Sequence, residues 1–310
     1  MTLKSPNVRA GLVACALVAS PALAEDLPFD ATCRLEMEVD SAISWHGPFG
    51  RGYEVFAPDE TIEVATVSIR HEGGPCRYFL TAAPNEASDN TLHGPEGSLR
   101  FDILRQPSGP SLLSPDYTGN QFSRLPGQFG AGVGAQEAML YVTIPPGQFV
   151  AGGTYSGQSI LRLFRDDPAG PELADQAPVS VVAPVAAVLE VDSMEAGTGS
   201  NAMSVDLGDL TAGVDRTLDF TVRSNAPVAA RFDSANRGML AHHARAPGIA
   251  YHLSVGGMQV DLQNALATYQ IGTPGSAQLP VPLRITVPAN VNAAAGNYQD
   301  TLTVVFIVDG

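Results

Sequence analysis

The C-terminal stretch Gly296-Asn-Tyr-Gln-Asp-Thr-Leu-Thr-Val-Val-Phe-Ile-Val-Asp-Gly310 decides the fold. A Gly-Asn turn opens it, and apolar side chains then recur at every second position, at Leu302, Val304, Phe306 and Val308. A period of two with β-branched and aromatic residues is typical of a β-strand. The sequence ends two residues later, so we expect a strand that has no following strand to pair with.

The same pattern occurs earlier in the chain at a constant offset of 143 residues. It runs from a short strand-like segment through a tyrosine to alternating apolar residues. The earlier copy is Val142-Thr-Ile-Pro145, Tyr155, Leu161 and Leu163, and the later copy is Ile285-Thr-Val-Pro288, Tyr298, Val304 and Phe306. Weaker matches in the same order, such as Val39-Asp-Ser41 with Val191-Asp-Ser193, support a tandem duplication.

Composition predicts an all-β protein. The 31 Gly and 24 Pro residues are spread along the chain, and they separate short β-favouring runs at the spacing of a β-sandwich. Gly256-Gly257 between two alternating runs indicates a two-residue hairpin. We expect two domains, residues 25–176 and 177–310, with residues 177–186 as a shared strand or linker.

Residues 1–24 have the pattern of a secretory signal. Lys4 and Arg9 precede a mostly apolar run, and Ala22-Leu-Ala24 matches a cleavage site. A lipoprotein box at Leu12-Val-Ala-Cys15 is the weaker alternative. The apolar run is shorter than the roughly 20 residues of a spanning helix, so we expect an exported chain without membrane insertion.

The mature chain would be strongly acidic. Loss of Lys4 and Arg9 leaves 15 basic residues, all Arg, against 32 acidic ones, a net charge of about −17. Such a surface repels nucleic acid and anionic lipid. Apart from this repulsion, the simplest explanation of the acidic charge is that it keeps an exported protein soluble.

Two cysteines, Cys33 and Cys76, remain after Cys15 leaves with the signal. In an exported chain they predict one disulfide, which would stabilise the fold by about 3–4 kcal/mol on the chain-entropy model. Two distant thiols without a nearby pair of histidines do not form a zinc site. In the duplicated alignment the cysteines fall on Val185 and Ala229, so both positions become apolar together.

The chain between the two copies is ambiguous. Residues 165–177 are rich in Asp, Pro and Gly and indicate a turn or linker. A long β-favouring run follows, with Pro178 and Pro184 inside it, and proline favours sheet edges or bends. Val179, Val181 and Val185 of this run either complete the first domain as a strand supplied in cis, or belong to an ordinary linker and one strand.

Several motifs of the second copy resemble the spore-coat-protein-U-like domain of Csu-type subunits from archaic chaperone–usher pili. They are Ser224-Asn225, Ser234-Ala-Asn-Arg-Gly-Met-Leu240, Ile249-Ala-Tyr251, Gly256-Gly257 and the terminal Ala-Gly-Asn-Tyr-Gln-Asp-Thr-Leu-Thr-Val.

The resemblance implies an immunoglobulin-like sandwich that lacks its last strand. A periplasmic pilus chaperone would lend that strand, and the next pilus subunit would then replace it with its own. The outer-membrane usher is the third partner that the resemblance implies. Leu302, Val304, Phe306 and Val308 would then line the acceptor groove. Residues 25–32 make a poor donor strand, so we expect a tip subunit on the cell surface, with the distal first domain as its adhesin.

Three Gly-rich and Pro-rich loops of the first copy carry large apolar residues, which we expect to be either core residues or exposed adhesive contacts. The candidate contacts are Trp45, Phe49, Leu112, Leu113 and Phe129. The nucleophile motif Gly-x-Ser-x-Gly and the metalloprotease motif His-Glu-x-x-His do not occur in the sequence. We therefore expect no catalytic residue, metal or cofactor. A paired-carboxylate glycosidase and a secreted, non-polymerising sandwich protein that binds carbohydrate or protein remain as alternatives.

Overall fold

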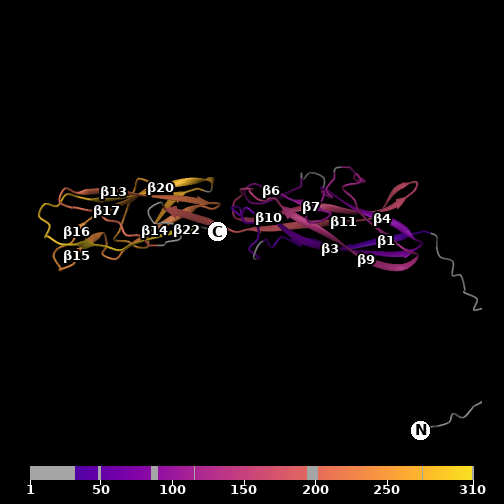
Figure 1. Cartoon of the computed structure of the whole chain (residues 1–310), viewed down its shortest axis with the longest axis horizontal. Helices are drawn as coiled ribbons and strands as arrows, with labels where there is room; N and C mark the ends of the chain where they lie inside the picture. Colours follow the sequence, from indigo (N-terminus) through magenta and orange to yellow (C-terminus); the bar gives the residue numbers. More distant parts are fainter. Residues whose placement is uncertain are drawn as a thin grey trace, which may run out of the picture.

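The computed structural model describes residues 32–47, 50–84, 90–114, 116–193, 202–273 and 275–308. The signal segment and residues 25–31 therefore lie outside the described residues. Regular secondary structure in the described ranges is β-strand, and none of their segments forms a helix long and apolar enough to cross a membrane. Two elongated β-sandwich units lie end to end (Figure 1), which confirms the all-β expectation.

The first unit consists of two sheets. One has the strand order β1-β3-β9-β7, and the other has β2-β11-β10-β4-β8 with β5 and β6 attached to β10. The strands are β1 (Arg34–Val39), β2 (Ala42–Ser44), β3 (Thr61–Gly73), β4 (Cys76–Pro84), β5 (Thr91–His93), β6 (Ser98–Arg100), β7 (Asp102–Leu104), β8 (Leu125–Phe129), β9 (Gly132–Ile144), β10 (Gly153–Asp167) and β11 (Gly170–Val185).

Alternating side chains from the two sheets form the first core. On β3, Val67 and Ile69 are fully buried, and on β10 Leu161 and Leu163 face them with exposed fractions of at most 1%. Because successive residues of a strand point to opposite faces, this burial follows from the period of two in the sequence. Each such side chain contributes about 1.5–3 kcal/mol when buried.

Strand β11 lies between β2 and β10 in the second sheet. It pairs antiparallel with β10 along its whole length and parallel with β2 at Ser180–Val182. Pro178 and Pro184 flank this doubly paired segment, so neither proline has to donate to β2. Of the turn or linker expected over residues 165–177, the structure has a turn between Asp167 and Gly170, and the rest of the segment belongs to the paired strands β10 and β11.

The second unit has a five-stranded sheet β12-β13-β20-β17-β18, a three-stranded sheet β19-β14-β22 and a small sheet β16-β15-β21. Gly256 and Gly257, both with positive φ, form the predicted hairpin turn between β17 and β18. The strands are β12 (Leu189–Ser193), β13 (Val214–Ser224), β14 (Val228–Ser234), β15 (Met239–His242), β16 (Ile249–Ala250), β17 (His252–Val255), β18 (Met258–Val260), β19 (Thr268–Gly272), β20 (Gly275–Val287), β21 (Tyr298–Gln299) and β22 (Leu302–Val308).

The two units repeat one local design at the offset of 143 seen in the sequence. Gly153 and Gly296 both have a φ of 148°, a conformation that favours glycine. Two residues later, Tyr155 donates to the Ala151 carbonyl at 3.0 Å, and Tyr298 donates to the Ala294 carbonyl at 3.0 Å. A tyrosine that bonds back to the preceding chain is a hallmark of immunoglobulin-like sandwiches. Strand β10 is therefore the counterpart of β22.

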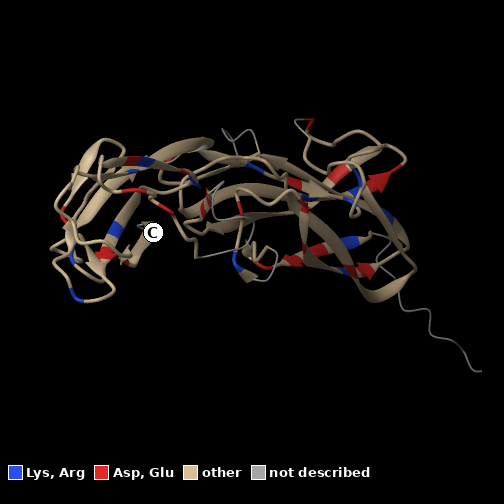
Figure 2. Ribbon diagram, turned by 60° about the vertical axis from the view of Figure 1, so that its left-hand side comes forward, with Lys and Arg blue, Asp and Glu red and all other residues tan. Residues whose placement is uncertain are grey.

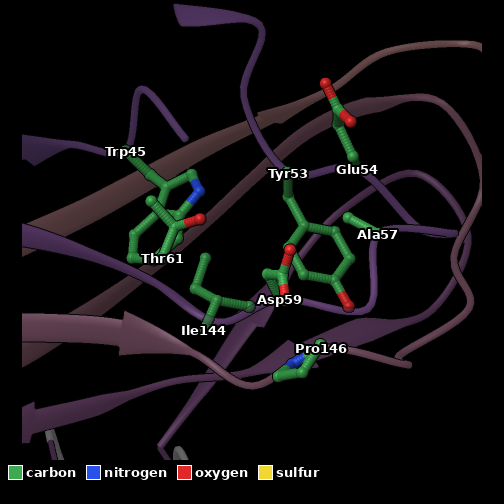
Figure 3. A pocket seen from close by; sticks show the side chains of 8 residues that line it. All are labelled: Trp45, Tyr53, Glu54, Ala57, Asp59, Thr61, Ile144 and Pro146. Carbon is green, nitrogen blue, oxygen red and sulfur yellow. The ribbon is translucent and has the colours of Figure 1, made fainter. Parts of the chain in front are cut away.

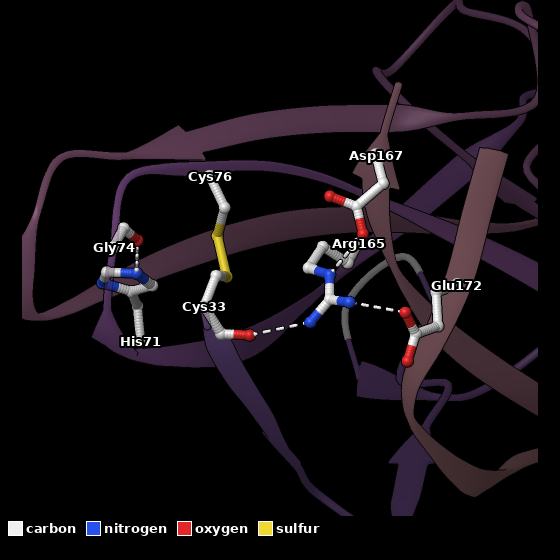
Figure 4. Close-up of a disulfide and its surroundings, with 7 residues drawn as sticks. All are labelled: Cys33, His71, Gly74, Cys76, Arg165, Asp167 and Glu172. Atoms are coloured by element: carbon white, nitrogen blue, oxygen red, sulfur yellow. Dashed lines mark hydrogen bonds and ion pairs between the residues drawn. A yellow bond between two sulfur atoms is a disulfide. The ribbon is translucent and has the colours of Figure 1, made fainter. Parts of the chain in front are cut away.

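Cys33 and Cys76 form the predicted disulfide, which joins the start of β1 to the start of β4 (Figure 4). Beside it, the Arg165 guanidinium donates to the Cys33 carbonyl and to carboxylates of Asp167 and Glu172. The disulfide and this cluster connect β1, β4 and the β10–β11 hairpin at the end of the first unit.

Charged residues are distributed over both units (Figure 2), and acidic residues outnumber basic ones, 32 to 17, in the full sequence. Cross-strand pairs such as Arg284 with Asp215 hold some of the arginines on exposed sheet faces. Hydrogen bonds from this guanidinium lower the pKa of the Asp215 carboxyl. Exposed pairs of this kind contribute little to stability.

Candidate strand-acceptor site

Strand β22 pairs on one side with β14, from Val228 opposite Val308 to Ser234 opposite Leu302. Its other edge has no strand partner in the described part of the chain. In the first unit, β10 pairs with β4 on one side and with β11 on the other. The second unit therefore contains the counterpart of β10 without a counterpart of β11.

Burial differs between the two strands in the same way. Leu161 and Leu163 of β10 are 1% and 0% exposed. Their counterparts Val304 and Phe306 are only partly buried, although they pack against the second core. Leu302 and Val308 are partly buried as well. We call Leu302, Val304, Phe306 and Val308 the acceptor edge, because these four apolar side chains lie beside an unpaired row of backbone groups.

A second extended segment packs against the same core without belonging to a sheet. Met203, Val205 and Leu207 are partly buried and alternate with exposed residues. The segment follows β12 in the chain as β2 follows β1. In the first unit, β2 is the parallel neighbour of β11. By its order in the chain and its contact with the core, the segment 203–207 is the counterpart of β2.

A polar network fixes the start of β22. Asp300 accepts hydrogen bonds from the hydroxyls of Ser234 at 2.5 Å and Tyr251 at 2.7 Å. Its other oxygen accepts from the backbone amides of Asn236 at 3.0 Å and Thr301 at 2.8 Å. Burial, assisted by the adjacent Asp300 carboxylate, raises the pKa of Tyr251, so the phenol stays protonated and donates. The sequence motifs include these residues, but their meeting is a long-range feature that spacing alone does not reveal.

We expect Asp300→Ala to destabilise the second unit by about 2–4 kcal/mol, because several buried donors lose their acceptor at once. Calorimetry of the full chain should show a lower transition for the second unit and an unchanged transition for the first. Asp233→Ala, at an exposed position of β14, is the matched control and should change neither transition. Equal effects of the two substitutions would contradict the role of the network.

The residues considered for a strand supplied in cis lie on β11. Val179 and Val181 are fully buried and Val185 is 4% exposed, all in the first core. They alternate with outward-facing residues such as Val182, which is only partly buried. The intervening Ala183 is also buried. This is the arrangement that a strand inserted between two others requires.

Four of the five candidate adhesive residues are core residues, so for them the first of the two alternatives holds and the prediction of exposed contacts is wrong. Trp45 and Leu112 are 2% and 0% exposed, and Leu113 and Phe129 are each 9% exposed. Large apolar side chains on Gly-rich loops here fold inward and fill the space between the sheets. Phe49 lies outside the described residues.

Local contacts explain this burial. Phe129 stacks on His71 with ring centroids 4.8 Å apart and on Tyr78 at 5.4 Å. The carbonyl of Leu112 accepts from the Ala82 amide at 3.0 Å, which fastens its loop to the sheet. Trp45 borders a cavity of about 10 Å³ (Figure 3), room for a single water rather than a ligand.

Among the described residues of the first unit, the most exposed large apolar side chain is that of Val133, at 88%. It lies beside the β8–β9 turn, where Gly132 pairs with Gly73. The turn between Asp167 and Gly170 lies at the same end, which is the end away from the second unit (Figure 1). The end of the first unit away from the second unit therefore presents the exposed apolar side chain of Val133.

One group of potential metal ligands occurs among the described residues: Cys33, Cys76 and His71 (Figure 4). The two sulfurs are joined in the disulfide and offer no thiolate. The Nε2 of His71 lies 2.8 Å from the Gly74 carbonyl, which can only accept, so that nitrogen donates a hydrogen bond. This cluster is part of the packing of the first unit rather than a metal centre.

No protein-family model matches the chain, and no curated protein matches it. Solved structures do resemble it. A chain from the pre-assembly complex of the chaperone CsuC with the tip adhesion subunit CsuE, from archaic chaperone–usher Csu pili of Acinetobacter baumannii, is 13% identical with a TM-score of 0.42. The match covers 87% of this chain and 99% of that one.

Two further likenesses are of the same kind. The CupB6 tip adhesin of Pseudomonas aeruginosa is 10% identical with a TM-score of 0.41, over 88% of this chain and 92% of that one. CfaE, the adhesive subunit of the CFA/I fimbria of enterotoxigenic Escherichia coli, is 12% identical with a TM-score of 0.36, over 89% and 82%. Because all three TM-scores lie below 0.5, we base the function on the strands of this chain.

Proposed function

We propose that this protein is a non-enzymatic, two-domain tip subunit of a chaperone–usher pilus. The second unit accepts a donor strand at the acceptor edge, and the first unit attaches the pilus to a surface. The observation that carries the proposal is the unpaired edge of β22, with partly buried Val304 and Phe306, beside a first unit whose equivalent edge is covered by β11. An open apolar edge promotes aggregation unless a partner covers it.

The proposed donor adds as a β-strand, with backbone hydrogen bonds to β22 and alternate side chains directed into the second core. By analogy with β11, it lies antiparallel to β22 and has residues 203–207 as its other neighbour. The partners are a periplasmic chaperone, the outer-membrane usher and the next subunit of the pilus. The protein would thus be exported through the periplasm to the cell surface.

The first unit needs no partner strand in this proposal, because β11 completes it in cis through Val179, Val181 and Val185. It lies at the end of the molecule away from the β15–β16 end of the second unit (Figure 1). That position suits attachment, and the apolar hairpin end around Val133 is the favoured contact surface.

Export with and without the chaperone of the same pilus system tests the proposal. We expect the full chain exported alone to aggregate or to be degraded, and the co-exported chain to be recovered as a soluble 1:1 complex. Hydrogen exchange should show backbone amides of β22 that become protected in the complex, because the donor strand bonds to them.

The opposite result would favour a secreted sandwich protein that does not polymerise. A chain that is soluble, monomeric and fully protected along β22 without any partner would contradict the proposal. Val305→Lys, on the exposed side of β22 where the side chain is 45% exposed, is a suitable control, since it should leave complex formation intact.

A further inference from the structure

The junction between the two units is a built contact rather than a loose tether. Residues 186–188 connect β11 to β12, and Asn225, which is fully buried, holds them. Its Oδ1 accepts from the Val188 amide at 2.7 Å, and its Nδ2 donates to the Ala186 carbonyl at 3.0 Å. The neighbouring Ser224 hydroxyl donates to the Val188 carbonyl at 2.9 Å.

Two loops of the first unit contact the second unit near the Asn225 turn, which is the turn between β13 and β14. The Gly152 amide donates to the Asn225 carbonyl at 3.3 Å, and the Arg223 guanidinium lies 4.3 Å from the centre of the Phe56 ring. Phe56 and Phe149 come from different loops, and their ring centroids are 6.3 Å apart. The loop before β10, residues 145–152, and the loop around Phe56 therefore form the face of the first unit that contacts the next domain.

The second unit repeats this face at its own far end. The loop between β20 and β21, residues 288–296, leads towards β22 and corresponds to residues 145–153. Gly296 and the Tyr298–Ala294 bond take the places of Gly153 and the Tyr155–Ala151 bond. The turn before β13 lies against this loop, since a Cβ on Gly213 would come within 2.8 Å of the Ala289 nitrogen. No domain of this chain covers the loop within the described residues, and Val291 on it is 80% exposed.

Two adjacent histidines hold the loop in place. The His242 Nε2 donates to the Ala295 carbonyl at 3.1 Å, and the His243 Nδ1 accepts from the Asn297 amide at 3.2 Å. Their rings lie 4.5 Å apart, and Gly296 passes so close that a Cβ there would lie 2.2 Å from His242 Nε2. The loop is thus fixed to β15 and presents Val291 from a defined backbone.

The direction of β11 shows where the chain that follows an added donor strand would leave the second unit. In the first unit, the last residue of β11, Val185, lies opposite Gly153 and leads directly into the second unit. A strand added antiparallel to β22 would likewise end near the start of β22, beside the loop before it. The chain that follows the donor strand must therefore fold next to residues 288–296.

We propose that residues 288–296, through Val291, are the docking surface for the folded domain of the next pilus subunit, in the manner in which residues 145–152 dock on the Asn225 turn. This inference rests on the proposed function and assigns a second contact besides strand addition. The occupant is a domain of the same sandwich fold, because the intrachain junction is formed by such a domain.

The dissociation of two complexes tests the docking surface. One contains this full chain and the shaft subunit exported with it, and the other contains this full chain and a synthetic peptide copying only that subunit's N-terminal donor segment. We expect Val291→Asp to accelerate dissociation of the first complex about tenfold or more and to leave the second unchanged. Val64→Asp, which alters a valine exposed to 57% on the first unit, should change neither.

Each outcome is decisive. Equal dissociation rates of Val291→Asp and the unmodified chain from the subunit would overturn the docking surface. A matching acceleration in the peptide complex would also overturn it, because the substitution would then act on the acceptor edge. If the unmodified chain bound neither the peptide nor the subunit, the proposed function itself would be refuted.

Discussion

Val181→Asp should destabilise the first unit by more than about 4 kcal/mol, because it places a carboxylate in the core without a partner. Val181 is fully buried on β11, between β10 and β2. Its neighbour Val182 faces outward and is only partly buried. Val182→Asp is therefore a control with the same chemical change one residue away, and it should cost less than about 1 kcal/mol.

The chain contains its own reporter for this experiment. Trp45 is the single tryptophan of the sequence, it is 2% exposed, and its amide donates to the Val182 carbonyl at 2.7 Å. Urea unfolding followed by tryptophan fluorescence thus measures the stability of the first unit, including the pairing of β11 within its sheet. If Val181→Asp yields no folded protein, Val181→Ala should still lower the midpoint clearly below that of Val182→Ala. Equal midpoints for the two alanine variants would refute completion in cis.

Supplying the missing strand should stabilise the second unit. A copy of residues 168–185 joined directly to Gly310 continues the offset of 143, so its apolar positions would face the second core in the register of β11 on β10. Each valine buried there contributes about 1.5–3 kcal/mol, and the added strand also gives backbone hydrogen-bond partners to the free edge of β22. We expect the calorimetric transition of the second unit to rise by about 10 °C or more.

The control carries the same extension with its copies of Val179 and Val181 replaced by Asp. It adds equal length but cannot fill an apolar core, so its transition should stay at that of the unmodified chain. Hydrogen exchange along β22 provides an independent measurement, since only a paired strand protects the free edge. A rise of equal size with both extensions, or with neither, would refute the acceptor edge.

Local pattern predicted much of the fold. The period of two at residues 302–308 predicts β22 correctly, and Gly256-Gly257 predicts its hairpin. The constant offset of 143 is visible in the sequence because both copies use the same glycine and tyrosine in the same local geometry. The two cysteines predict their disulfide, since an exported chain with two thiols has one pairing.

Features set by long-range packing could not be predicted in this way. Trp45 and Phe129 lie on Gly-rich loops, where the sequence pattern is the same for a core residue and for an exposed one. Residues 165–177 have the composition of a turn or linker, yet most of them lie in β10 and β11, which pair with each other on either side of a tight turn. The hydroxyl donors to Asp300, on Ser234 and Tyr251, are 66 and 49 residues away in the sequence, so their meeting depends on the finished sandwich.

The continuity of β11 with the second unit has a mechanical consequence. A force that pulls the two units apart acts along the axis of β11. Strand β11 pairs antiparallel with β10 along this axis, from Gly153 opposite Val185 to Asp167 opposite Gly170. Under such a load, the hydrogen bonds between the two strands are stretched together in shear instead of opening one after another. The joint at residues 186–188 therefore transmits force into the most extensively paired strands of the first unit, and the link between a surface and the rest of a filament would fail late under tension.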